Sequence, residues 1–96
     1  MVVPPGGVIA RYGGEEFAVL LPRLPRLQAS DVAEKLRRVV EQQIRGPGRR
    51  EPHPVTISVG VASFPEDAKA ELELIRMADR RLYQAKRDGR NLVCAA

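Results

Sequence analysis

The sequence predicts an α+β fold with the element order β-β-α-β-α-β, in which two helices pack on a mainly antiparallel sheet. Two patterns carry this prediction. Residues 55–62 alternate between branched apolar side chains and small ones, which is the period of a strand with one bulky face and one small face. Residues 30–44 and 70–88 instead repeat apolar side chains every three or four positions, which is the period of a helix with one buried face.

The first two elements are expected to form a β-hairpin over residues 8–21. Two β-prone runs flank the sequence Gly-Gly-Glu-Glu, which suits a tight connection between antiparallel strands. Pro22 then ends the second strand, because proline cannot donate to a strand ladder.

A helix is expected over residues 30–44. Ser30 or Asp31 can cap its first turn, and Glu34 follows Asp31 at the spacing of a capping box. The next ten residues are rich in Gly and Pro, so we expect a surface loop and assign it no chemistry.

The second half is expected to contain a strand at 54–62, a helix at 70–88 and a last short strand at 91–95. The small face of the first strand favours close packing by a helix. Gly89 is the predicted stop of the second helix. Four arginines of this half are assigned to solvent: Arg76, Arg80, Arg81 and Arg87.

Composition bounds the function classes. The chain has 96 residues, a net charge of +4 and a pI near 9.8, which indicates one small domain with anionic partners. Its one cysteine forms no internal disulfide, which is typical of a reducing cytosol, and we expect a cytoplasmic location. No apolar run approaches the roughly 18 residues that span a membrane, so no membrane contact is expected.

The Gly-Gly-Glu-Glu connection leaves two interpretations open. Glycines supply the backbone freedom of an ordinary hairpin turn, which is the simpler one. Glutamate, however, is a poor turn residue. Bare glycine backbone beside a carboxylate would also let a phosphate or sugar approach a Mg²⁺ ion, which prefers hard oxygen ligands.

Lys86 and Arg90 likewise have two interpretations. They lie four residues apart at a helix end, where two cations can face one polyphosphate. Cations also favour the C-terminal end of a helix through its dipole, so a solvated helix end explains them without a ligand.

Residues 11–17, with the sequence RYGGEEF, resemble the signature of the GGDEF family of diguanylate cyclases, in the variant with Glu at the third position. Three further stretches agree with that family in order and spacing. They are VTISVGVA at 55–62, Ala-Asp at 78–79, and LYQAKRDGRN at 82–91. The resemblance covers nearly the whole chain from Val8 onward.

The resemblance implies an enzyme that joins two GTP molecules into cyclic di-GMP across a two-fold dimer, with Mg²⁺ or Mn²⁺ as the metal. It implies that Glu15 binds the metal and helps to activate the attacking 3′-hydroxyl, with Glu16 as a second acidic contributor. Gly13 and Gly14 would form the floor under the nucleotide.

Lys86 and Arg90 match the family positions that hold the terminal phosphates of GTP. Many family members also carry an Arg-x-x-Asp product-inhibition site ahead of the signature. Its two positions are Pro4 and Gly7 here, so we expect that this site is absent.

Family domains begin with a central strand that carries a metal-binding aspartate, and residues 1–96 show no match to it. We therefore expect a single truncated GGDEF domain, partial in its nucleotidyl cyclase-like fold and inactive as it stands. An upstream sensory or receiver domain would belong to the parent protein. The hairpin and strand 54–62 would lack their common neighbour, which leaves open strand edges. A homodimer or a strand-exchanged oligomer is the expected consequence.

Two other functions remain open. One is a non-catalytic GTP-binding, dimerisation or regulatory GGDEF domain, which the missing aspartate favours. The other is a basic nucleic-acid-binding module, which the absence of aromatic residues among the arginines disfavours. Its basic residues would be Arg37, Arg38, Arg45, Arg49 and Arg50.

Overall fold

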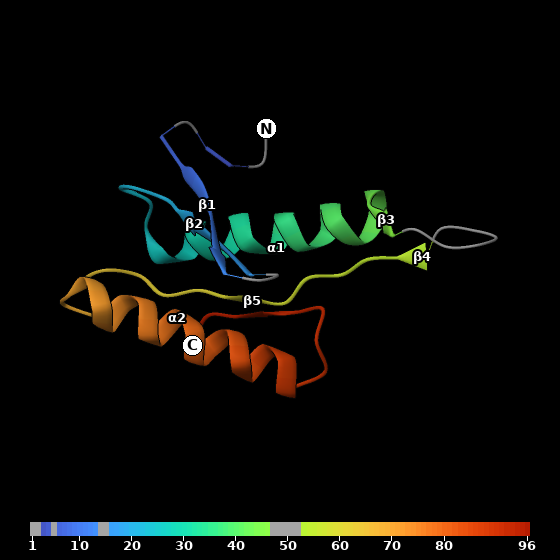
Figure 1. The fold of residues 1–96 in the computed structure, drawn as a ribbon. Helices are drawn as coiled ribbons and strands as arrows, with labels where there is room; N and C mark the ends of the chain where they lie inside the picture. The colour runs from blue at the N-terminus through green and yellow to red at the C-terminus, as the bar shows by residue number, and fades with distance from the viewer. Residues whose placement is uncertain (1–2, 5, 14–15, 47–52) are drawn as a thin grey trace.

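The computed structural model describes residues 3–4, 6–13, 16–46 and 53–96, and these form two long helices and several short strands (Figure 1). The predicted α+β class is confirmed. The elements are β1 Val8–Gly13, β2 Glu16–Leu20, α1 Arg26–Gln43, β3 Arg45–Gly46, β4 His53–Pro54, β5 Val59–Gly60, α2 Glu71–Arg87 and β6 Val93–Cys94.

Within the described residues the strands pair two by two. β1 with β2 and β3 with β4 are antiparallel, and β5 with β6 is parallel. The parallel pair is joined through α2, so residues 59–94 form a βαβ unit, the connection that parallel strands require. In the view of Figure 1, β5 and β6 run between α1 and α2.

β5 and α2 pack backbone to backbone. A Cβ atom added at Gly60 would lie 2.2 Å from the carbonyl oxygen of Ala78 and 2.3 Å from the amide nitrogen of Leu82. Real Cβ atoms do not come this close to backbone, so only glycine fits at this position. The small face of the strand therefore receives the helix, as its alternation predicted.

Helix α1 begins at Arg26, four residues ahead of its predicted start, and the predicted cap at Ser30 or Asp31 is wrong. Pro25 stands at the N-cap with no side-chain cap hydrogen bond, and its carbonyl oxygen accepts from the Ala29 amide at 2.9 Å. Tertiary packing explains the earlier start, because Ala29 lies in the core, 8% exposed. Burial of Ala29 in the first turn outweighs the local capping signal.

The region predicted as one strand over 54–62 has ladder pairing only at β4 and β5. Alternation predicts which face a residue would take, whereas a ladder also needs a neighbouring strand, and β5 has β6 on one side. β3 and β4 pair across the region predicted as a loop, with Gly46 opposite His53. No alternation of apolar and polar residues there signals this short ladder.

The buried core of the described residues is made of small side chains: Ala29, Ala33, Ala68 and Ala85, with the polar Ser63. Short side chains let α1, α2 and the strands approach closely. α1 contacts β6, and α2 contacts both β5 and β6. The centre of the packing is therefore the βαβ unit with α1 against it. No helix of the described residues is long and apolar enough to cross a membrane.

Candidate functional site

The Gly-Gly-Glu-Glu connection lies at the turn of the β1–β2 hairpin. Gly13 pairs with Glu16, and the register shifts between Arg11 and Gly13, which places a bulge at Tyr12. Bulges of this kind occur beside active sites, where they redirect the strand end. Gly14 and Glu15 lie outside the described residues, so their predicted roles remain predictions. Glu16 is the first residue of β2 and is half-buried.

The hairpin strands expose large apolar side chains. Ile9 is 60% exposed, Phe17 66% and Leu20 59%. Ile9 is opposite Val19 and Val8 is opposite Leu20, so apolar side chains occur on both faces of the ribbon. Among the described elements, β1 and β2 make their extensive contacts with each other. The hairpin is consequently held by its own ladder more than by the core.

The C-terminal end of α2 carries the two predicted phosphate-binding cations. Lys86 lies in the last turn and is half-buried, and Arg90 is exposed three residues after the helix ends. Gly89 has a φ of 127°, and the Arg90 amide donates to the Ala85 carbonyl oxygen at 3.0 Å. This is the long hydrogen bond of a Schellman cap, which reverses the chain sharply at the helix end.

Neither Lys86 nor Arg90 belongs to an ion pair of the described part of the chain. The ion pairs there involve Arg26, Arg37, Arg38 and Arg81 with acidic partners. Two cations at one helix end, both without an acidic partner in the described region, suit an anionic ligand.

Arg81 was assigned to solvent, and this assignment is wrong. Its guanidinium donates to both carboxylate oxygens of Asp67, at 2.8 and 3.0 Å, and to the Val61 carbonyl oxygen at 2.8 Å. The Arg81 side chain is 12% exposed and the Asp67 side chain is 6% exposed. A signal was present in the sequence: Arg81 comes three residues after Ala78 and four before Ala85, so it falls on the apolar face of α2.

The Asp67 carboxylate joins several segments. It also accepts from the Ser63 amide at 2.9 Å, and Arg26 of α1 lies 3.5 Å away. The hydrogen bond from Arg81 lowers the pKa of Asp67 against the opposing effect of burial, and the same bond raises the pKa of Arg81. Both groups are therefore held in their charged forms, which fixes α2 to the turn after β5.

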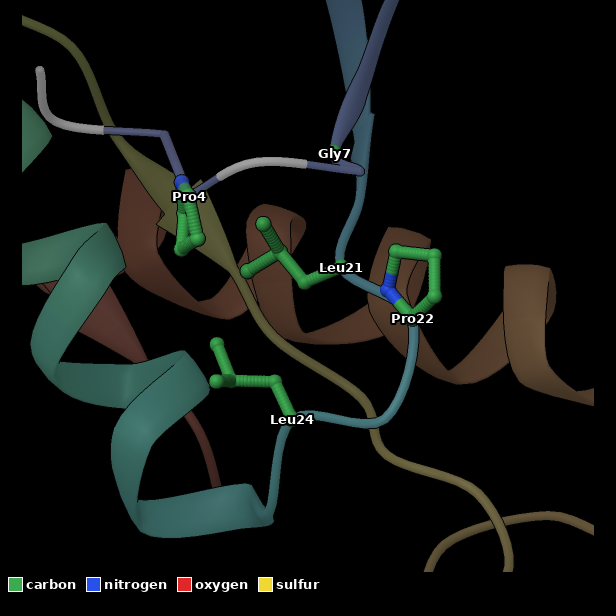
Figure 2. Close-up of a pocket in the computed structure, with 5 residues that line it drawn as sticks. All are labelled: Pro4, Gly7, Leu21, Pro22 and Leu24. Atoms are coloured by element: carbon green, nitrogen blue, oxygen red, sulfur yellow. The ribbon is translucent and has the colours of Figure 1, made fainter.

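No group of three potential metal ligands occurs among the described residues, a set that leaves out Glu15. A shallow hollow lies at the base of the hairpin, lined by Pro4, Gly7, Leu21, Pro22 and Leu24. Figure 2 shows the Pro4, Leu21 and Leu24 side chains directed toward one another. Its lining has no charged side chain, so it does not match a nucleotide phosphate.

The predicted site residues come from two separate parts of the fold. Within the described residues no hydrogen bond or ion pair joins Glu16 of the hairpin to Lys86 or Arg90. The hairpin and α2 are also not among the elements in extensive contact. The structure thus places the acidic and the basic residues on different elements, with no direct link between them in the described residues.

The family model for "Diguanylate cyclase, GGDEF domain" matches residues 1–92. Diguanylate cyclase A of Treponema denticola is 42% identical over 85 residues, which is 88% of this chain and 22% of that protein. The chain therefore spans about a fifth of the length of this curated relative.

Two solved structures are similar. The GGDEF domain of DgcB from Caulobacter crescentus, in complex with c-di-GMP, is 34% identical with a TM-score of 0.81 and covers 98% of this chain and 56% of its own. The active GGEEF domain of a diguanylate cyclase from Vibrio cholerae is 29% identical with a TM-score of 0.85. That match covers 98% of this chain and 58% of the Vibrio cholerae chain.

Proposed function

Because this chain belongs to the family of GGDEF diguanylate cyclase domains, we propose that it supplies two parts of a site that joins two GTP molecules into cyclic di-GMP. The observation that carries this proposal is the register of the hairpin, in which Gly13 pairs with Glu16 and leaves Gly14 and Glu15 as the connection. A similar GGEEF domain from Vibrio cholerae is described as active, which supports Glu at the third position of the signature.

In this proposal the hairpin turn is the acidic part of the site. Glu15 binds Mg²⁺ or Mn²⁺ and helps to remove the proton of the attacking 3′-hydroxyl, and Glu16 adds a second carboxylate. Gly13 and Gly14 let the nucleotide lie against the backbone. The donor set fits Mg²⁺, which proteins commonly hold through one or two carboxylates together with substrate phosphates. When bound, the ion would neutralise charge on the triphosphate.

The end of α2 is the basic part of the site. Lys86 and Arg90 would hold the terminal phosphates. In the described region neither side chain forms an ion pair with a carboxylate that a phosphate would have to displace. Because the two parts are not joined by direct contacts among described residues, GTP with its metal would connect them. Binding to both parts would orient the reacting groups, which are not oriented in free nucleotides.

Association is part of this proposal. Two GTP molecules must meet, so two copies of the domain would face each other, by a two-fold dimer or by strand exchange. The exposed Ile9, Phe17 and Leu20 side chains support burial of the hairpin against another segment. Light scattering should detect association as concentration rises, and a compact monomer at high concentration would contradict it. A sensory or receiver domain in the parent protein would set the encounter of two copies.

Calorimetry with GTP and Mg²⁺, followed by chromatography for cyclic di-GMP, tests the proposal. We expect this chain to bind GTP without forming product, because the metal site of the family includes an aspartate with no match here. Glu15→Ala should weaken binding at least about tenfold. Glu71→Ala, at an exposed position in the first turn of α2, should not. Absence of GTP binding would refute the proposal, and product formation would refute the inactive state.

The alternatives differ in their observable consequences. If the domain were a non-catalytic GTP-binding or regulatory one, its complete parent protein would bind GTP but form no product. A nucleic-acid-binding surface is disfavoured, because Arg37 is 16% exposed and pairs with Glu34 and Glu41, and Arg38 also pairs with Glu34.

A further inference from the structure

The loop after α2 has three consecutive residues with positive φ. The values are 127° for Gly89, 63° for Arg90 and 52° for Asn91. Glycine adopts such angles freely and asparagine tolerates them, whereas arginine is disfavoured there by the contact of its Cβ with the backbone. A strained arginine persists only when its surroundings determine its conformation, and such strain is concentrated at functional positions.

The Asn91 side chain is fixed at both ends by one turn of α1. Arg37 Nη1 donates to Asn91 Oδ1 at 2.9 Å, and Asn91 Nδ2 donates to Glu41 Oε2. Arg37 in turn is held by ion pairs to Glu34 and Glu41. The amide therefore has one orientation, with its oxygen toward the cation and its nitrogen toward the carboxylate.

The backbone of the loop is fixed as well. The backbone amide of Asn91 donates to Ser58 Oγ at 3.1 Å, and Ser58 comes just before β5. The backbone amide of Arg90 donates to the Ala85 carbonyl oxygen at 3.0 Å. Arg90 is thus placed by bonds from three parts of the fold: α2, the segment before β5, and α1. Its own side chain remains exposed and outside the ion pairs of the described region.

We propose that Asn91 is a positioning residue that holds Arg90 in its left-handed conformation, with its guanidinium aimed for the phosphates of the nucleotide. This inference rests on the proposed function, which assigns Arg90 to phosphate binding. The physical reason is preorganisation: without these hydrogen bonds Arg90 relaxes to an ordinary conformation, and binding must then restore the strained one.

A double-mutant cycle on the 96-residue chain tests the proposal, with GTP and Mg²⁺ titrated by calorimetry. Asn91→Ala should weaken GTP binding about tenfold in the wild-type background and less than about twofold in an Arg90→Ala background. A residue that only stabilises the fold would weaken binding equally in both backgrounds, and that result would overturn the proposal.

Ser58→Ala serves as a milder second variant if Asn91→Ala does not fold. It removes the acceptor of the Asn91 amide without adding bulk. We expect a loss of a few-fold in GTP affinity, again only while Arg90 is present. Full affinity in Ser58→Ala with Arg90 present would oppose the proposal.

A nucleotide-free measurement separates failure of this inference from failure of the proposed function. The nuclear Overhauser effect between the amide proton and the Hα of Arg90 reports the sign of its φ angle by NMR, because these two protons lie closer together at positive φ than at negative φ. In the unliganded chain it should indicate a positive φ that is lost in Asn91→Ala. Retention of the positive φ would overturn the positioning role whether or not the chain binds GTP. Loss of the positive φ with no GTP binding by wild type would leave the positioning intact and refute the proposed function.

Discussion

The βαβ unit and the β1–β2 hairpin both carry predicted site residues, yet they are stabilised in different ways. The βαβ unit has backbone contact between Gly60 and α2, a parallel ladder and the buried Asp67–Arg81 ion pair. The hairpin has its own antiparallel ladder and exposes apolar side chains such as Phe17. The cations therefore lie on the well-packed βαβ unit, whereas Glu16 lies on a hairpin whose extensive contacts among the described elements are those of its own ladder.

The largest expected effect is on the βαβ unit. Asp67→Ala leaves the Arg81 guanidinium without its carboxylate and should lower the free energy of unfolding by about 3 kcal/mol. This is the lower end for a buried ion pair, because Arg81 keeps the Val61 carbonyl. Asp31→Ala, at an exposed position of α1, is the control and should change stability by less than about 0.5 kcal/mol. Urea unfolding measures both, and equal effects would contradict the comparison.

The second-largest loss of stability is expected from a steric change in the βαβ unit. Gly60→Ala places a methyl group against the backbone of Ala78 and Leu82, which cannot move aside as a side chain could. We expect a loss of about 2 kcal/mol from overpacking. Ala10→Val, which adds carbon atoms on the exposed β1 strand, should be close to neutral. Thermal unfolding of the two variants checks this, and an undisturbed Gly60→Ala would mean that α2 and β5 are further apart.

Acid should weaken the same unit. Since the pKa of Asp67 is lowered in the fold, its carboxylate contributes stability above the ordinary carboxyl value of about 3.9. That contribution is lost as the pH falls through the lowered value. As the pH is lowered below about 4, the urea midpoint of wild type should therefore decrease more steeply than that of Asp67→Ala. Parallel profiles for the two proteins would show that another group causes acid unfolding.

The smallest effect on stability is expected in the hairpin. Phe17 is 66% exposed, so Phe17→Ser should change the free energy of unfolding of the monomer by less than about 0.5 kcal/mol. Association should respond instead, because the same change removes apolar surface available to a partner. Sedimentation measures the association. A large loss of monomer stability would place Phe17 in the core.

Local patterns predicted much of this fold, and contacts distant in sequence explain what they missed. α2 spans Glu71–Arg87 against a predicted 70–88, since its apolar repeat and the glycine after it are local signals. The start of α1 was missed because the packing of Ala29 is tertiary. The side-chain amide of Asn91 contacts Arg37 and Glu41 of α1, which lie more than forty residues away in the sequence. No spacing rule connects such positions.

The sequence named candidate site residues but could not predict their geometry. The signature and the pair Lys86 and Arg90 point to a nucleotide through the family resemblance. The exposed state of Arg90 and its positive φ required the structure. Whether Glu15 and Glu16 act as assigned remains a prediction, because Glu15 lies outside the described residues.

Hydrogen exchange of this chain, with and without GTP and Mg²⁺, tests the central claim that GTP joins the two parts of the site. Without nucleotide, amides of α2 and β6 should be protected more strongly than those of β1 and β2. With nucleotide, protection should rise together in the hairpin and at Arg90 and Asn91. A hairpin as protected as α2 before GTP is added, or a response confined to one part, would contradict the account.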